Sequence, residues 1–258
     1  MNFLRSVVCV VIGIIVLIPC AIAVLLWSVF ARGDTLYYGV AKPFLSAMIW
    51  LAEHIGGVKY RVMGAEHLPA KGDNQPIILC PKHQSTWETF ALPTIMRQPL
   101  SYVFKRELLA IPFFGWALAR LDMVHIDRSN RTEAWNKVAA QGRELMNTGH
   151  WVIMFPEGTR TERGKQGVYK SGASRLAVLT GASIVPIAVT SARCWPRRSF
   201  ALIPGTIDVS IGAPISSQGK EPAQMMREVE QWIEAEMRRL DPQAYPETQS
   251  QTQVTEET

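Results

Sequence analysis

The sequence is poor in charge: Asp, Glu, Lys and Arg make up only 19% of its 258 residues, whereas hydrophobic residues make up 48%. This composition excludes an intrinsically disordered chain, because such chains combine low hydrophobicity with many charges. The apolar content is enough for a sizeable core, and the length favours one large domain with appendages. We expect some of the apolar surface to face lipid.

Cysteine is also scarce, and the four cysteines stand apart: Cys9, Cys20, Cys80 and Cys194. They show no paired spacing and no neighbouring His and Cys set, which excludes a disulfide scaffold and a zinc site. The sequence therefore predicts reduced structural thiols and no bound metal.

The last segment, residues 241–258, contains four carboxylates and no Lys or Arg. The net charge of the whole chain is +5, so the rest of the chain carries +9. Such a charge favours partners that bear phosphate: nucleic acid, an anionic membrane surface or a phosphorylated substrate. The sequence lacks a compact basic and aromatic module for nucleic acid, so we predict no nucleic-acid partner. The polar tail itself is predicted to be disordered.

Residues 6–31 contain no charged residue. As a helix this run would be about 39 Å long at ~1.5 Å per residue, which is enough to cross a bilayer. Arg5 and Arg32 flank it, and Trp27 lies near one end, where an interfacial anchor is typical. A cleavable signal peptide is the alternative, but the apolar run is longer than a usual signal core. We therefore expect a retained membrane helix.

A second apolar segment, residues 36–55, has only Lys42 and Glu53 as charged residues. It fits a helix in the membrane surface or an ordinary core helix, and its aromatic content does not separate the two. Glycines 56 and 57 end it. The sequence thus predicts a membrane anchor and interfacial helix (1–57), a globular domain (58–240) and a tail (241–258).

In the globular part, short apolar runs alternate with helical patterns, which is typical of an α/β fold. Five runs predict strands, most of them buried on both faces: residues 76–80, 102–104, 151–155, 184–189 and 207–211. Three segments predict helices, the last with an apolar period near 3.6 residues: 133–146, 174–179 and 225–240.

A histidine and a carboxylate follow the first of these strands, within Lys82-His83-Gln84-Ser85-Thr86-Trp87-Glu88. Active sites often lie at strand-to-helix junctions. His83 and Glu88 can form a dyad only if His83 lies outside the helix, because residues five apart on a helix point about 140° away from each other. Alternatively, Ser85 and Glu88 have the spacing of a capping box, in which Glu88 would bind the backbone N–H of Ser85. The residues alone leave both interpretations open.

A second polar segment, Phe155-Pro156-Glu157-Gly158-Thr159-Arg160, follows the strand at residue 151. Arg160 could present a fixed fork of donors to phosphate oxygens. The segment is not a P-loop, because five residues rather than four separate Gly158 from Gly164 and Gln166 replaces the required Ser or Thr. The sequence also lacks the G-x-S-x-G and H-E-x-x-H motifs.

Taken in order, these segments resemble the glycerolipid acyltransferases, most closely the bacterial 1-acylglycerol-3-phosphate acyltransferases. The H-x4-D motif of that family corresponds to His83 and Glu88, with Glu in place of the usual Asp. Its K-x-E-L…P-x-x-G, F-P-E-G-T-R and V-P-I motifs correspond to residues 105–115, 155–160 and 185–187. The resemblance covers about residues 60–215 and implies a mixed α/β sheet flanked by helices, with 58–240 as the acyltransferase domain.

The resemblance implies transfer of a fatty acyl group from a thioester to the free hydroxyl of 1-acylglycerol-3-phosphate, giving phosphatidic acid for phospholipid biosynthesis. His83 would act as general base, and Glu88 would orient it. The resemblance implies a role in substrate binding, or in shaping the turn beside the substrate, for Lys105, Arg106, Glu157, Gly158, Thr159 and Arg160.

The resemblance also implies that the enzyme needs no cofactor and uses acyl-CoA or acyl-carrier protein as donor. It implies a place in the bacterial inner membrane, with the active domain facing the cytoplasm and an anionic membrane surface beside it. Cys80 is expected to be a buried strand thiol rather than a covalent nucleophile. Two alternatives stay open: another acceptor, such as glycerol-3-phosphate or a lyso-aminolipid, and a non-catalytic membrane-anchored lipid-binding protein.

Overall fold

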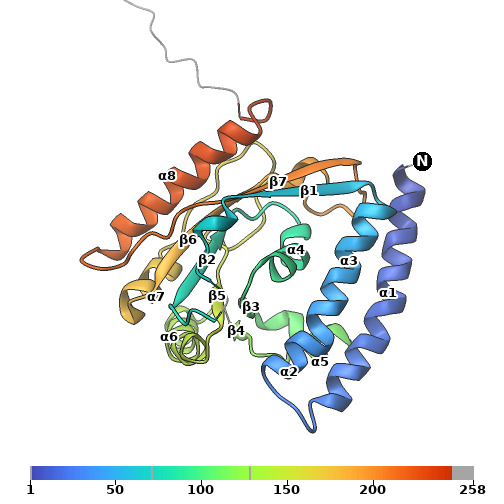
Figure 1. The fold of residues 1–258 in the computed structure, drawn as a ribbon, viewed down its shortest axis with the longest axis horizontal. Helices are drawn as coiled ribbons and strands as arrows, with labels where there is room; N and C mark the ends of the chain where they lie inside the picture. The colour runs from blue at the N-terminus through green and yellow to red at the C-terminus, as the bar shows by residue number, and fades with distance from the viewer. Residues whose placement is uncertain (1, 71, 128, 246–258) are drawn as a thin grey trace, which may run out of the picture.

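A seven-stranded sheet forms the middle layer of the protein (Figure 1). The structure is a computed structural model, and it describes residues 2–70, 72–127 and 129–245. The strands are β1 (Val58–Met63), β2 (Ile77–Pro81), β3 (Leu100–Lys105), β4 (Val124–Ile126), β5 (Trp151–Ile153), β6 (Ser183–Val189) and β7 (Gly205–Ile211). Their order is β1-β7-β6-β2-β5-β3-β4. Neighbouring strands are parallel except β6 and β7, which are antiparallel. The predicted mixed sheet is confirmed.

Helices cover both faces of the sheet. They are α1 (Asn2–Trp27), α2 (Asp34–Leu36), a π-helical turn (Tyr37–Ala41), α3 (Lys42–His54), α4 (Trp87–Ile95), α5 (Phe114–Leu118), α6 (Arg131–Asn147), α7 (Gly172–Thr180) and α8 (Pro222–Leu240). Short 3₁₀ turns lie at Ala65–His67, Arg106–Ala110 and Ser191–Arg193. In Figure 1, α3 and α4 lie on one side of the sheet, with α1 outside α3, and α6, α7 and α8 lie on the other side. The three predicted helices correspond to α6, α7 and α8 within a few residues.

Two separate cores follow from the pleat of the strands, which points successive side chains to opposite faces. On β2, Ile77 and Leu79 belong to the core under α3 and α4, whereas Ile78 and Cys80 belong to the core under α7 and α8. All four side chains are fully or almost fully buried. This explains why the central strands are continuous apolar runs in the sequence.

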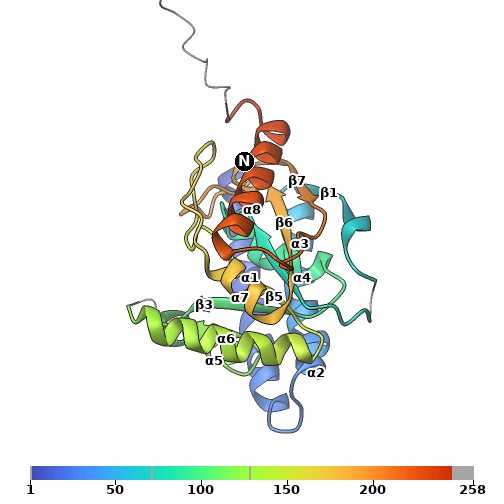
Figure 2. The ribbon, with the colours of Figure 1, turned by 90° about the vertical axis from the view of Figure 1, so that its left-hand side faces the viewer.

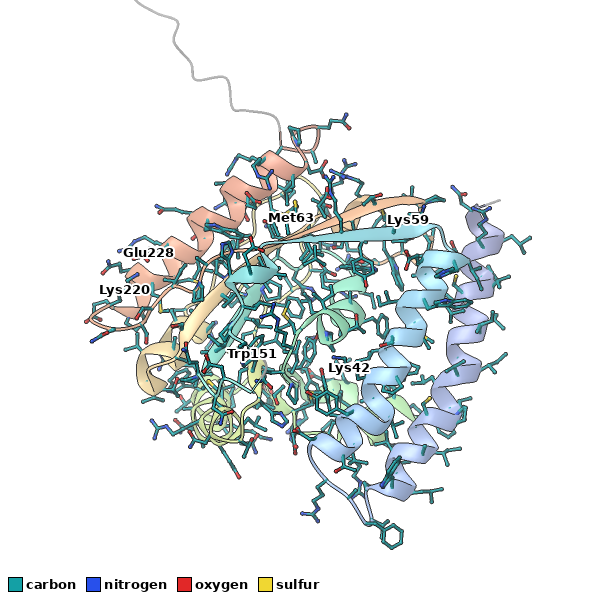
Figure 3. All side chains as sticks on the ribbon, in the orientation of Figure 1. Lys42, Lys59, Met63, Trp151, Lys220 and Glu228 are labelled. Carbon is teal, nitrogen blue, oxygen red and sulfur yellow. The ribbon has the colours of Figure 1, made fainter. Side chains whose placement is uncertain are left out.

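Two strands have no counterpart in the sequence prediction, β1 and β4. Among the described residues, β1 lies at one edge of the sheet and pairs with β7, and Lys59 and Met63 mark its course in Figure 3. Its side chains alternate in exposure from the start of the strand, where Val58 is buried and Lys59 is exposed. A half-exposed edge strand of this kind lacks the continuous apolar run that identified the central strands.

The amphipathic helix α8 packs on the sheet beside α6 and α7, and Figure 2 shows the three on one face. Of its predicted apolar positions, Trp232 is partly buried, and the others are buried together with Met225: Met226, Val229, Ile233, Met237 and Leu240. The chain continues against the domain after α8, because Asp241 and Tyr245 are 2% and 6% exposed. The prediction of a disordered tail is therefore wrong for residues 241–245, which pack on the domain. The rest of the predicted tail, residues 246–258, lies outside the described residues.

Helix α1 is long and apolar enough to cross a membrane, but it also packs along the domain. The Ser6 hydroxyl accepts a hydrogen bond from the Leu202 amide at 2.8 Å, and the Cys9 thiol donates to the Leu51 carbonyl at 3.5 Å. Its outer face is apolar and exposed, with Ile15 at 63% and Leu26 at 66%. One side of α1 thus contacts protein, and the other is free to contact lipid.

The second apolar segment is buried on one side and exposed on the other, and its place in the membrane surface stays a prediction. Leu36 and Ile49 are buried in the protein, whereas Tyr38 and Trp50 on the same segment are exposed. The segment is therefore a core helix on one side and an exposed apolar surface on the other.

Candidate active site

The predicted functional segments meet because three neighbouring strands run parallel. β2, β5 and β3 lie side by side, so their carboxyl ends share one edge of the sheet, where α/β proteins commonly bind ligands. His83 follows β2, the segment 155–160 follows β5, and Lys105 ends β3. Sequence segments up to about 80 residues apart are thus brought to one place.

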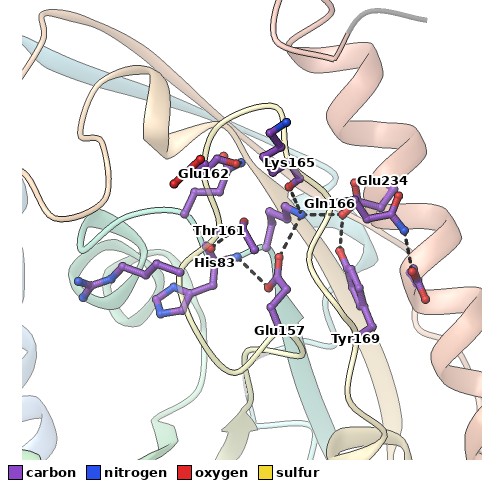
Figure 4. A network of polar contacts seen from close by, with 12 residues as sticks. His83, Glu157, Thr161, Glu162, Lys165, Gln166, Tyr169 and Glu234 are labelled. Atoms are coloured by element: carbon purple, nitrogen blue, oxygen red, sulfur yellow. Dashed lines mark hydrogen bonds and ion pairs between the residues drawn. The ribbon is translucent and has the colours of Figure 1, made fainter. Parts of the chain in front are cut away.

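The backbone of His83 is held by the segment that follows β5 (Figure 4). The His83 N–H donates to Glu157 Oε2 at 3.2 Å, and its carbonyl accepts from the amide of Thr161 at 2.8 Å and from its hydroxyl at 3.2 Å. The imidazole stacks on the Phe155 ring with centroids 3.7 Å apart and an interplanar angle of 20°. The histidine and the F-P-E-G-T-R turn therefore form one structural unit.

Glu88 lies in the first turn of α4 and is fully buried. Its Oε1 accepts from the amide of Gln84 at 2.7 Å and from the hydroxyl of Ser191 at 2.7 Å, and both oxygens accept from the amide of Ser85 at 3.0 Å. Burial raises the pKa of Glu88 to about 7, although these hydrogen bonds act to lower it. The bond of the capping alternative is present, and the pairing of Glu88 with His83 stays a prediction.

Glu157 has a buried cation as its partner. It is 3% exposed, and its Oε1 forms an ion pair with Lys82 Nζ at 3.0 Å. Burial raises the pKa of Glu157 to about 7, while the charge of Lys82 acts to lower it. Glu157 is not among the residues that line the cavity next to His83, which is described below. This geometry favours a role in shaping the turn over direct contact with substrate.

Gly158 gives the turn a backbone conformation that other residues rarely adopt. Its φ is +67°, and a Cβ at this position would lie 2.8 Å from Lys170 Nζ. Glycine avoids both the strain and the close contact. The turn therefore places Thr159 and Arg160 at the cavity surface.

A cavity of about 560 Å³ opens in front of His83. Most of its wall is apolar and comes from α1, α3, α4, β3 and α5. Representative wall residues from these elements are Leu17, Ala21, Val24, Phe44, Phe90, Tyr102, Val103 and Leu118. This shape and lining suit a long apolar chain.

Four cations also line this cavity: Lys105, Arg160, Arg197 and Arg198. The Nε of Arg160 is buried and has no hydrogen-bond partner among the residues that the structure describes. The carbonyl of Arg160 accepts from Arg197 at 3.0 Å, which holds the two arginines together. An anionic group bound here would satisfy the buried donor of Arg160.

The predicted site residues fall into two groups. His83, Lys105, Gly158, Thr159 and Arg160 line the cavity, whereas Glu88, Arg106 and Glu157 are not among its lining residues. Arg106 turns away to form an ion pair with Asp127 at 3.0 Å on the exposed surface.

Sequence reasoning missed two of the cavity cations. Arg197 and Arg198 lie in the loop between β6 and β7. The signal that could have found them is the position of this loop, which follows the V-P-I strand and begins at the same edge of the sheet as His83.

The described part of the chain, residues 2–70, 72–127 and 129–245, contains no group of three or more His, Cys, Asp or Glu that could hold a metal ion. Cys80 is a free thiol with no exposed surface, and burial raises its pKa. The prediction of a buried strand thiol is confirmed.

Comparisons with known proteins identify the family of this chain. The model of the family described as Acyltransferase matches residues 59–190, just over half of the chain. The chain belongs to this acyltransferase family. It is 41% identical over 209 residues to the 1-acyl-sn-glycerol-3-phosphate acyltransferase of Pseudomonas aeruginosa, which covers 80% of this chain and 79% of that protein.

A more distant relative and a solved structure are also similar to this chain. The 1-acyl-sn-glycerol-3-phosphate acyltransferase alpha of Mus musculus is 29% identical over 181 residues, covering 69% of this chain and 62% of that protein. The crystal structure of the 1-acyl-sn-glycerophosphate (LPA) acyltransferase PlsC from Thermotoga maritima superposes with a TM-score of 0.77. It covers 93% of this chain and 96% of that chain at 22% identity, which confirms the fold.

Proposed function

We propose that this acyltransferase transfers a fatty acyl group from an acyl thioester to the free hydroxyl of 1-acylglycerol-3-phosphate, giving phosphatidic acid. The observation that carries the proposal is the cavity, whose lining combines a mostly apolar wall, four cations and His83. An acceptor with one acyl chain and one phosphate has matching chemistry. The similarity to the Pseudomonas aeruginosa enzyme supports the same acceptor.

The proposed reaction is direct transfer without an acyl-enzyme. The hydroxyl oxygen of the acceptor attacks the thioester carbonyl carbon while His83 takes the hydroxyl proton. The carbon–sulfur bond then breaks, and the thiolate leaves and takes up a proton. Glu88 would stabilise the positive charge that develops on His83, and the buried Cys80 takes no part.

In this proposal the substrate phosphate lies at the cationic part of the cavity. Arg160 and Lys105 would bind its oxygens, because a guanidinium forms strong, oriented hydrogen bonds with phosphate. The bound phosphate would fix which hydroxyl faces His83. The other cations, Arg197 and Arg198, add to the local positive charge.

We further propose that α1 anchors the enzyme in the bacterial inner membrane, with the domain on the cytoplasmic side. The exposed apolar face of α1 supports contact with lipid, and Trp50 and Trp116 extend the exposed apolar surface beside it. Because α1 also lines the cavity, a lipid acceptor could reach His83 without leaving the membrane surface. The donor would be acyl-CoA or acyl-carrier protein, arriving from the cytosol.

The test is an acyl-transfer assay with purified protein in vesicles. Lysophosphatidate and a monoacylglycerol of the same chain are offered as acceptors, each with acyl-CoA and with acyl-carrier protein as donor. We expect phosphatidic acid from lysophosphatidate and a much lower rate with monoacylglycerol. Equal rates for the two acceptors, or no transfer to lysophosphatidate with either donor, would refute the proposed acceptor.

A further inference from the structure

The C-terminal part of the chain contacts both sequence neighbours of His83. Glu234 on α8 forms an ion pair with Lys82 at 2.6 Å. Beyond the end of α8, the Tyr245 hydroxyl accepts a hydrogen bond from Gln84 Nε2 at 2.9 Å. Both contacts come from residues outside the segment 59–190 that matches the family.

Lys82 connects α8 to the turn that holds His83. Figure 4 labels Glu234, Glu157 and His83 in this network. The Lys82 side chain has no exposed surface, and its Nζ lies 3.0 Å from Glu157 Oε1 and 2.6 Å from Glu234 Oε1. The second oxygen of Glu157 accepts the backbone N–H of His83. A continuous set of contacts thus runs from Glu234 through Lys82 and Glu157 to the backbone of His83.

This set of contacts is a costly way to stabilise a core. Removing two carboxylates and one ammonium group from water carries a desolvation cost that ion pairing often fails to exceed, and apolar side chains of similar volume commonly stabilise as well or better. The contacts are also specific: Tyr169 donates to Glu234 at 2.8 Å, and Lys82 donates to the Lys165 carbonyl at 3.3 Å. The arrangement is therefore weak evidence for added stability, and it is suited to fixing a position.

We propose that Lys82, Glu234 and Tyr245 are positioning residues, through which the C-terminal helix and its extension fix the backbone of His83 relative to the bound substrate. The proposal rests on the proposed role of His83 as general base. Displacing a catalytic group by about 1 Å can reduce the rate by about 100-fold, so a contact that acts only on the backbone can still control turnover.

The test compares three variants with a matched control. Glu234→Gln keeps the shape of the side chain and removes its charge, Tyr245→Phe removes one oxygen, and Lys82→Met removes the cation. The control is Glu230→Gln, the same change one turn earlier on α8, where the carboxylate accepts from exposed Gln166 at 2.7 Å. For each protein, kcat and KM for lysophosphatidate and the thermal unfolding midpoint are measured.

We expect Glu234→Gln and Tyr245→Phe each to lower kcat roughly 3- to 10-fold, the effect of one lost hydrogen bond. Lys82→Met should lower kcat by about 100-fold. KM should change less than kcat, because Lys105 and Arg160 are untouched, and Glu230→Gln should match the wild type. A double variant of Lys82→Met and Glu234→Gln should lose little more than Lys82→Met alone, because both changes break the same set of contacts.

The proposal is overturned if Glu234→Gln and Tyr245→Phe keep the kcat of Glu230→Gln. It is also overturned if they lower only the unfolding midpoint, with unchanged turnover per folded molecule. If Lys82→Met fails to fold, the two milder variants decide. His83→Ala in the same assay separates the proposed general base from the proposed positioning residues. An active His83→Ala variant refutes His83 as general base. An inactive one confines any failure to the positioning residues.

Discussion

The lining of the cavity combines four cations, which we call the cationic end, with apolar residues, which we call the apolar end, and different parts of the molecule supply the two groups. The cations come from the end of strand β3 and from loops that follow β5 and β6, whereas much of the apolar wall comes from α1 and α3 in the N-terminal segment and from α5. A sheet edge holds charged groups in fixed positions, as phosphate recognition requires. A wall of packed helices offers a continuous apolar surface for an acyl chain. Changes at one end should therefore alter headgroup selectivity, and changes at the other should alter chain selectivity.

The largest effect is expected at His83, which lines the cavity together with both groups. His83→Ala removes the group that accepts the hydroxyl proton, so the rate of transfer should fall roughly 10²- to 10⁴-fold with every acceptor and chain length. The measurement is kcat of the folded variant in vesicles. Near-normal turnover would show that another group is the base.

At the cationic end, Arg160→Lys keeps the charge but loses the planar pair of donors. Charge-assisted hydrogen bonds contribute about 1.5 to 3 kcal/mol, so kcat/KM for lysophosphatidate should fall about 10- to 150-fold. The loss should be confined to phosphorylated acceptors, which monoacylglycerol of the same chain length tests. An equal loss with both acceptors would mean that Arg160 holds the loop rather than the phosphate.

A smaller effect is expected at Glu88, which is fully buried and is not among the lining residues of the cavity. Glu88→Gln should lower kcat on the order of 10-fold, because a neutral amide stabilises the imidazolium less and its NH₂ group cannot accept the N–H bonds that the carboxylate accepts. Glu88→Asp, which restores the usual residue of the family motif, should keep substantial activity. If Glu88→Gln has the turnover of the wild type, Glu88 acts only as a helix cap.

At the apolar end, Ala21 lies on the inner side of α1 and is 2% exposed. Ala21→Phe should fill part of the cavity and lower kcat/KM for long-chain substrates by roughly 4-fold for each methylene that loses its place, at about 0.8 kcal/mol per methylene. Short-chain substrates should be nearly unaffected. Ile14→Phe on the outer face of α1, where Ile14 is 53% exposed, is the control. The comparison of the two ends fails if both variants behave alike.

The sequence was sufficient for the motif residues and insufficient for their partners. His83, Lys105 and Arg160 follow apolar runs, and parallel strands bring such positions to one edge. Arg106 differs from Lys105 because the chain changes from strand to 3₁₀ turn between them, which the motif does not reveal. The alternation of Val58, Tyr60 and Val62 with polar residues is the signal that could have indicated this edge strand, because one face of β1 is exposed.

Long-range partners could not be predicted, because hydropathy indicates an environment and not a neighbour. The apolar run of α1 predicted contact with lipid, but nothing in it indicated that Ala21 and Val24 also line the cavity. Glu234 lies 152 residues after Lys82, and on α8 it reads as one of several charged positions of an amphipathic helix. The packing of α8 alone makes it a partner of Lys82.

A crystal structure of the protein with lysophosphatidate bound would test most directly that one cavity holds phosphate, hydroxyl and chain together. The phosphate should lie within hydrogen-bond distance of Arg160 and Lys105, and the free hydroxyl should lie within hydrogen-bond distance of the His83 imidazole. The acyl chain should lie along the wall that contains Ala21. A phosphate bound away from Arg160, or a chain that lies outside this cavity, would contradict the proposed site.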